Sequence, residues 1–152
     1  MDIHTALVKM EERKISTEKA GDFIYSDLHG AQSIFVGRVR NENNGKKVKA
    51  VTYDAHEQVV IKSFKSICNA AKNKFDSNSR VFLEHAIGYV PLGEISIIIA
   101  VGAGHRDEVF KICRYILEEV KHQSPIWKKE HYAGGTEDWL PGHSLRPKEE
   151  VK

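Results

Sequence analysis

Two long stretches of the chain repeat apolar residues at the spacing of one helical face. The first runs over residues 57–75 and carries Val59, Val60, Phe64, Ile67, Cys68, Ala71 and Phe75. The second runs over residues 106–122 and carries Val109, Phe110, Cys113, Ile116, Leu117 and Val120. Pro125 then ends it, because proline has no backbone N–H to donate within a helix. We therefore predict two long helices that each bury one face.

Shorter stretches alternate apolar and polar residues, as strands do. We expect strands over residues 31–40 and 47–54, joined as an antiparallel hairpin because Asn43-Asn44-Gly45 between them is a turn sequence. Further strands are expected at residues 80–89, 95–101 and 126–132, and a short helix over residues 18–27 with Ser16 or Thr17 as its N-cap. Residues 1–15 show no clear period. The pattern predicts one α+β domain over residues 1–140 and a polar tail over residues 141–152 that is a candidate for mobility.

Composition narrows the class of protein. The 152 residues carry a net charge of +2, which does not support binding of nucleic acid by bulk electrostatics. No apolar run approaches the roughly 18–20 residues that cross a bilayer, and the N-terminus has no apolar signal region. The two cysteines, Cys68 and Cys113, fall on apolar helical faces and are expected to be buried free thiols. Together these features predict a cytoplasmic protein.

Basic residues gather around the second predicted helix. His105 and Arg106 stand at its start, where free backbone N–H groups and the helix dipole favour an anion. Lys121 lies over the edge of its apolar face, where partial burial lowers the pKa of an amine and makes it a usable base. Lys128 and Lys129 follow Pro125. The spacing by itself also allows a capping histidine, a solvated arginine and a Lys121 amine that stays in water.

Other motifs leave further readings open. Arg38 and Arg40 share one face of the first strand, and Lys46, Lys47 and Lys49 surround the turn; this basic hairpin allows a non-catalytic module that binds RNA or an acidic protein. Gly102 and Gly104 follow a strand as in a dinucleotide-binding fingerprint, but Asp107 takes the place of the third glycine. The histidines show no close paired spacing for a metal, and no serine lies in a nucleophile elbow.

Several sequence blocks, in one collinear order over residues 28–140, resemble the catalytic (large) subunit of molybdopterin synthase. The blocks are Phe35-Val36-Gly37-Arg38-Val39-Arg40-Asn41, His85-Ala86-Ile87-Gly88, Gly93-Glu94, Gly104-His105-Arg106, Lys121 and Pro125-Ile126-Trp127-Lys128-Lys129-Glu130. The last block and the His-Arg pair are specific to this family, and several blocks in the same order are stronger evidence for the resemblance than any single block.

The resemblance implies an α/β hammerhead fold with an additional small antiparallel β subdomain. It implies a sulfurtransferase of molybdenum cofactor biosynthesis that converts cyclic pyranopterin monophosphate, also called precursor Z, to molybdopterin. The sulfur would come from the thiocarboxylated Gly-Gly terminus of a small ubiquitin-like partner, and the large subunit would form a homodimer within a heterotetramer. It implies no metal and no cofactor at this step.

The resemblance also implies residue roles. Lys121 and Lys128 match catalytic lysines, and the substrate-binding positions are Arg38, Val39, Arg40, His105, Arg106, Lys129 and Glu130. The chain departs from the family at Tyr53-Asp54-Ala55-His56, at Leu117, and after Trp139. Some members carry there an arginine that reaches the neighbouring subunit, whereas this chain has Pro141-Gly142-His143, with Arg146 following.

Overall fold

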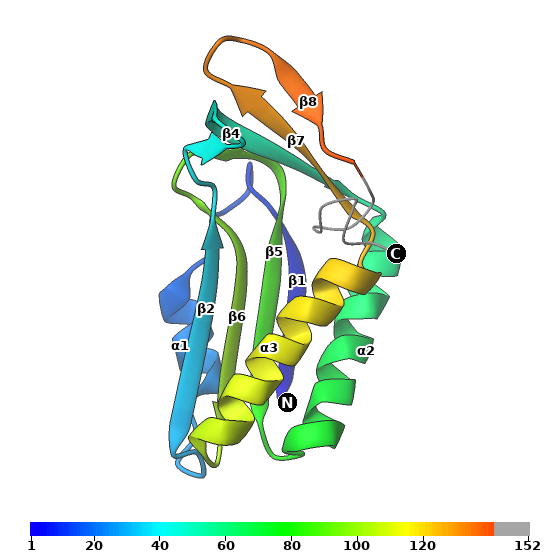
Figure 1. Ribbon diagram of the computed structural model, residues 1–152. Coiled ribbons are helices and arrows are strands. Elements are labelled where there is room, and N and C mark those ends of the chain that lie inside the picture. The colour runs from blue at the N-terminus through cyan, green and yellow to red at the C-terminus, as the bar shows by residue number, and fades with distance from the viewer. Residues whose placement is uncertain (142–152) are drawn as a thin grey trace.

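The computed structural model describes residues 1–141, which form three helices and eight strands (Figure 1). The helices are α1 (Thr17–Ile24), α2 (Glu57–Phe75) and α3 (Arg106–Gln123). The strands are β1 (Ile3–Lys9), β2 (Ala31–Arg38), β3 (Glu42–Asn43), β4 (Lys46–Ala55), β5 (Arg80–Pro91), β6 (Ile95–Ala103), β7 (Ile126–Tyr132) and β8 (Glu137–Trp139). His143, Arg146 and the rest of the expected tail beyond Pro141 lie outside the described residues.

The strands form one mixed, mostly antiparallel sheet in the order β2-β6-β5-β4-β7-β8, with β1 parallel to β5 and β3 paired to β4. The long strand β5 changes neighbours along its length: residues 80–85 pair with β6, and residues 88–91 pair with β4. Gly88 stands at this change with φ 98°, a conformation that strains residues with a Cβ. Beyond this point β4, β7 and β8 cross over one end of the main sheet (Figure 1).

Helices cover both faces of the main sheet. α1 packs on β5 and β6, while α2 and α3 lie side by side on the opposite face (Figure 1). Both long helices are confirmed, and α2 and α3 together bury Val60, Phe64, Ile67, Cys68, Ala71, Val109, Ile112, Ile116 and Val120. None of the helices in residues 1–141 is long and apolar enough to span a membrane.

Some details of the predicted helical faces are wrong. Val59 and Phe110 are 45% and 65% exposed, because each lies about 100° around the helix from its buried neighbour and so turns toward solvent. In α3, Ile112 was not part of the predicted apolar face, but its side chain is fully buried. Both cysteines are free thiols, as expected, but only Cys68 is buried, whereas Cys113 is half-buried.

The predicted hairpin across residues 31–54 is also wrong. β2 pairs antiparallel with β6, from Ala31 opposite Ala103 to Arg38 opposite Ile95. The turn at Asn44-Gly45 joins only the two-residue β3 to β4. Period-two alternation identifies a strand but not its partner, and β6, which is buried along its whole length, pairs with β2 and β5 instead.

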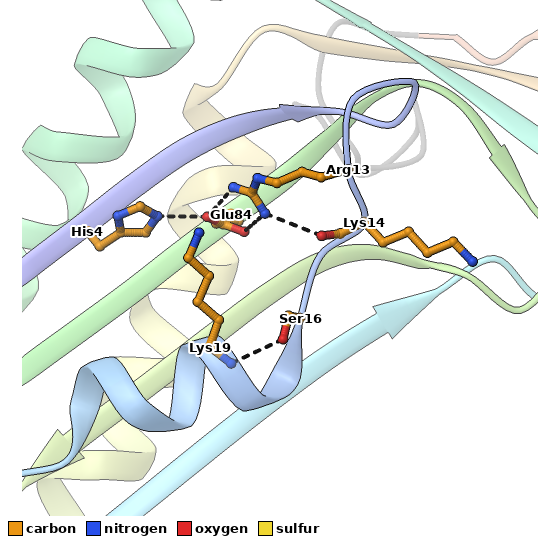
Figure 2. A network of polar contacts seen from close by, with 6 residues as sticks. All are labelled: His4, Arg13, Lys14, Ser16, Lys19 and Glu84. Carbon is orange, nitrogen blue, oxygen red and sulfur yellow. Dashed lines mark hydrogen bonds and ion pairs between the residues drawn. The ribbon is translucent and has the colours of Figure 1, made fainter.

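The strand β1 lies in a stretch where no element was expected, and a buried carboxylate ties it to β5. Glu84 of β5 is fully buried and accepts hydrogen bonds from Arg13 Nη1 at 3.2 Å and Nη2 at 2.8 Å (Figure 2). His4 Nε2 of β1 lies 2.7 Å from the same carboxylate. Burial by itself raises the pKa of Glu84, but the hydrogen bonds and charges of Arg13 and His4 outweigh it and hold this pKa below its ordinary value.

Candidate active site

A cavity of about 160 Å³ lies where the C-terminal end of α3 meets the crossing strands β4 and β7. Its walls come from β2, β4, β5, β6, α3 and β7, and the lining residues are Phe35, Gly37, Tyr53, His85, Ser96, Ile97, Leu117, Lys121 and Lys128. The walls are therefore partly apolar, with two lysines among the polar groups. Because its walls come from six elements, this cavity exists only in the folded chain.

Both residues predicted to be catalytic line this cavity. Lys121 lies in the last turn of α3, one turn beyond Leu117. The helix ends at Gln123, and the chain turns at Ser124-Pro125 into β7, which brings Lys128 back toward Lys121. Lys128 lies directly opposite Tyr53 in the β4–β7 ladder. The break at Pro125 thus places two amines of one chain segment in a shared space.

The surroundings of Lys128 change its acidity. Burial lowers the pKa of Lys128 below its ordinary value, and the charges of Lys121 and Arg40 lower it further, while the charge of Glu130 acts in the opposite direction. An amine with a lowered pKa has a larger neutral fraction near pH 7 and can accept a proton. The cavity therefore combines an amine of lowered pKa with neighbouring cationic groups.

Residues 38–40, which were predicted to bind substrate, follow the cavity residue Gly37 and differ from one another in their contacts. Arg40 is exposed and near enough to act on the charge of Lys128. Arg38 is exposed, and its Nη1 donates to the Gly93 carbonyl at 2.8 Å. Val39 is buried; its N–H donates to the Glu94 carbonyl at 3.1 Å and its carbonyl accepts from the Gly93 N–H at 2.8 Å. The backbone of Val39 is thus occupied by protein contacts that anchor the arginines.

Alternation along β7 places Lys128 and Glu130 on one face of the strand and Lys129 on the other. Lys129 Nζ lies 3.2 Å from Glu137 Oε1 and 5.1 Å from the centre of the Trp139 ring. Within one chain, Lys129 therefore does not line the cavity with the other two lysines.

The carboxylate of Glu130 is held by protein donors. The side chain is 4% exposed, and Asn43 Nδ2 donates to its two oxygens at 2.9 and 3.0 Å. The Tyr132 hydroxyl donates to Oε1 at 3.0 Å. Glu130 consequently ties β7 to β3, and it acts on Lys128 through its charge.

His105 and Arg106 lie at the other end of α3. They line a separate, open hollow with Gly30 and Gly104, and the His105 side chain is 89% exposed. Lys121 lies fifteen positions after Arg106 in α3, which corresponds to about 22 Å at a rise of about 1.5 Å per residue. The structure therefore does not bring His105 and Arg106 to the two lysines within one chain.

One polar residue of the cavity, His85, had no predicted role. His85 is fully buried on β5, and its ring meets the Tyr53 ring nearly edge-on, with centroids 4.8 Å apart. The sequence does contain a signal for His85, because it is a polar residue inside a buried strand. The direction of its side chain, toward the cavity, requires the fold.

Comparison with known proteins decides the family. Residues 10–123 match the MoaE protein family. The chain belongs to the MoaE family. A relative from Synechococcus elongatus, described as molybdopterin synthase catalytic subunit, is 37% identical over 91% of this chain and 84% of its own length. A relative of the same description from Pyrococcus abyssi is 37% identical over 90% of each chain.

The fold agrees with the family. The crystal structure of molybdopterin synthase from Staphylococcus aureus superposes with a TM-score of 0.80 at 27% identity, covering 93% of this chain and 96% of that chain. A MoaE protein from Burkholderia ambifaria superposes with a TM-score of 0.73 at 21% identity, covering 96% of this chain and 93% of that chain. The predicted fold class, α+β with a hammerhead arrangement and a small antiparallel part, is confirmed.

The alternative readings lose their support in this MoaE chain. A dinucleotide-binding fold needs a parallel sheet, whereas β6 pairs antiparallel with both of its neighbours. Gly102 has a packing reason instead, since a Cβ there would lie 2.6 Å from the Ile24 carbonyl oxygen. The lysines around the turn are exposed, but the relatives are enzymes and give no support to a non-catalytic binding module.

Proposed function

We propose that this protein acts as the catalytic subunit of a molybdopterin synthase. It converts cyclic pyranopterin monophosphate to molybdopterin, with sulfur from the thiocarboxylated C-terminus of a small ubiquitin-like carrier. The observation that carries this proposal is the meeting of Lys121 and Lys128 in one cavity of a MoaE chain. Two amines in a partly apolar space suit an anionic substrate and a reaction that moves protons.

Each lysine receives a role from its surroundings. Lys128, whose pKa is lowered, exchanges a proton with the reacting groups. Lys121 supplies positive charge to the thiocarboxylate and the phosphate-bearing substrate, with Arg40 at the edge of the cavity. Glu130 is a positioning residue that holds β7, and therefore Lys128, against β3. No step in this scheme requires a metal or a cofactor.

The carrier partner suits the cavity. A terminal Gly-Gly has no side chains, so it needs less room than other termini to bring a thiocarboxylate to Lys121 and Lys128. One chain of a structure from Helicobacter pylori, described as a complex of subunits 1 and 2 of molybdopterin-converting factor, superposes with a TM-score of 0.69 at 20% identity, covering 97% of this chain and 96% of that chain. We also place the protein in the cytoplasm, where its free thiols Cys68 and Cys113 remain reduced.

A second copy of the chain would complete the anion site. His105 and Arg106 match substrate-binding positions, but about 22 Å of helix separates Arg106 from Lys121 in one chain. In a homodimer, His105 and Arg106 of the second copy can approach the lysines of the first. We therefore place the active sites at the contact between two copies, each of which also binds one carrier.

The catalytic role is tested by Lys121→Ala. The variant should lose molybdopterin formation when mixed with thiocarboxylated carrier and the pterin substrate, while its melting temperature and carrier binding stay near those of the native protein. Lys62→Ala, at an exposed position of α2, is the matched control and should retain full turnover. Native-like turnover by Lys121→Ala would refute the assigned role, and no product from the native protein would refute the function.

The shared site is tested by mixing two inactive variants. In a mixed dimer of Lys121→Ala and Arg106→Ala, one of the two sites contains neither substitution if Arg106 comes from the second copy. Random exchange of subunits then restores about a quarter of the native turnover, since half of the dimers are mixed and each has one intact site. If Arg106 acts within its own chain, every site contains a substitution and the mixture stays inactive.

A further inference from the structure

A buried histidine faces the proposed active site without a complete set of partners. His85 is fully buried and lines the same cavity as Lys121 and Lys128. Its Nδ1 lies 2.8 Å from the carbonyl oxygen of Ala86. Its Nε2 is buried and has no hydrogen-bond partner among residues 1–141. Buried polar atoms of folded proteins are nearly always paired, so this nitrogen calls for an explanation.

The contact with Ala86 fixes the state of the ring. A carbonyl oxygen can only accept, so Nδ1 carries the hydrogen and donates it. Burial lowers the pKa of His85 to about 4, and the nearby charge of Lys128 acts in the same direction, while the Ala86 contact opposes them. The ring is therefore neutral near pH 7, and Nε2 presents an unshared electron pair. The edge-on contact with Tyr53 holds the ring in this orientation.

The acceptor at Nε2 differs in kind from the other polar groups of the cavity. The ammonium groups of Lys121 and Lys128 donate and attract anions. The Ser96 hydroxyl donates to the Gly37 carbonyl at 3.2 Å. Among the described residues that line the cavity, His85 contributes a neutral ring nitrogen that can accept and cannot donate. A ligand that satisfies all of these groups needs an anionic part for the lysines and an N–H or O–H group for the histidine.

We propose that His85 is a substrate-positioning residue whose Nε2 accepts a hydrogen bond from an N–H or O–H group of the bound pterin. This inference rests on the proposed function and adds a polarity rule to it: the same cavity that attracts negative charge also selects for a hydrogen-bond donor. A ligand with an acceptor at that position leaves two electron pairs facing each other and is rejected. The lysines thus select the charge of the substrate, and His85 selects its orientation.

Two substitutions separate this role from a structural one. In His85→Asn the amide nitrogen can replace Nδ1 and keep the Ala86 contact, but nothing replaces Nε2. In His85→Gln the amide oxygen can replace Nε2 as an acceptor, but the Ala86 contact is lost. KM for the pterin and kcat are measured at saturating carrier, together with the melting temperature of each variant. We expect KM to rise about fivefold to tenfold in His85→Asn, the effect of one neutral hydrogen bond, and to stay within about twofold in His85→Gln.

The opposite ranking, a native-like KM in His85→Asn with a raised KM in His85→Gln, would show that the Ala86 contact matters and would overturn the inference. A measurement on the native protein covers the case in which neither variant folds. The ¹⁵N resonance of His85 Nε2 should move toward that of a hydrogen-bonded nitrogen when the pterin saturates the protein, and an unchanged resonance would overturn the proposal. If the native protein forms molybdopterin but the His85 results are contrary, only this inference fails. If the native protein forms no molybdopterin, the proposed function itself fails.

Discussion

Replacing Arg13 with methionine tests how strongly the buried carboxylate of Glu84 depends on its partners. Glu84 is fully buried, and Arg13 donates to both of its oxygens. Removing one partner of a buried ion pair costs about 3–5 kcal/mol, because the other charge remains buried. The Arg13 side chain is 38% exposed, so water already weakens this pair. We therefore expect Arg13→Met to lower the free energy of unfolding by about 2–3 kcal/mol at pH 7.

The dependence on pH gives this prediction a second signature. In the native protein the lowered pKa of Glu84 contributes stability that is present above the unfolded pKa and is lost as the pH falls through the folded pKa. Without Arg13, the contacts with His4 are left to oppose burial, so the pKa of Glu84 is higher in Arg13→Met than in the native protein, and protonation at acid pH relieves the variant sooner. Acid pH thus lowers the stability of the native protein and relieves the variant, and both effects reduce the difference between them. The difference in stability between the native protein and Arg13→Met should shrink as the pH falls from 7 toward 4.

Urea unfolding of both proteins at several pH values measures this difference. The matched control is Arg114→Met on α3, whose side chain is 80% exposed and lies 3.5 Å from Glu118. An exposed pair of this kind contributes within about 0.5 kcal/mol, so the control should unfold almost as the native protein does. Equal losses in the two variants, or a difference for Arg13→Met that does not change with pH, would contradict the importance of the buried carboxylate.

Three further predictions concern the active site. Glu130→Ala removes the acceptor of Asn43 and should lower both turnover and the free energy of unfolding, the latter by about 3 kcal/mol in urea titrations; an unchanged stability would contradict its positioning role. Gly37→Ala places a Cβ 2.7 Å from Ile97 Cγ2 at the cavity wall and should raise the KM for the pterin severalfold, whereas an unchanged KM would show that the wall yields. The pKa of folded His85 is about 4, below its ordinary value, so the neutral ring stabilises the fold fully above about pH 6.5. As the pH falls from 6.5 toward 4, the native protein should lose about 3 kcal/mol of unfolding free energy through this residue. Glutamine does not titrate, so unfolding curves of His85→Gln should show a loss smaller by about 3 kcal/mol over the same pH range.

The sequence predicted the elements whose evidence is local. The helices over residues 57–75 and 106–123 follow from apolar spacing and from Pro125, because both signals lie within the element itself. The pairing of β2 with β6 joins residues more than 50 positions apart, and nothing in residues 31–54 specifies that partner. β1 escaped prediction because β5 and the contacts of His4, rather than its own alternation, hold it in the sheet.

The candidate site divides in the same way. The ordered blocks identified Lys121 and Lys128, and the fold places both in one cavity. The same blocks joined them to Arg106, but the length of α3 separates these residues in one chain. A motif records which residues a reaction needs and not which copy of the chain supplies them. His85 shows the complementary limit, since its free Nε2 depends on the direction of the side chain and on the Ala86 contact.

The position of the reacting amine rests on backbone features that lie away from it. Lys128 is carried by β7, β7 pairs with β4, and β4 pairs with the second half of β5. The first half of β5 carries His85, and Gly88 stands at the bend between the halves. One strand therefore supplies the proposed acceptor and also sets where the crossing strands place Lys128 relative to the main sheet. Gly88 has a positive φ at this point, so a residue with a Cβ there strains the link between His85, which we assign to orienting the substrate, and the strands that place Lys128, which we assign to exchanging a proton with it.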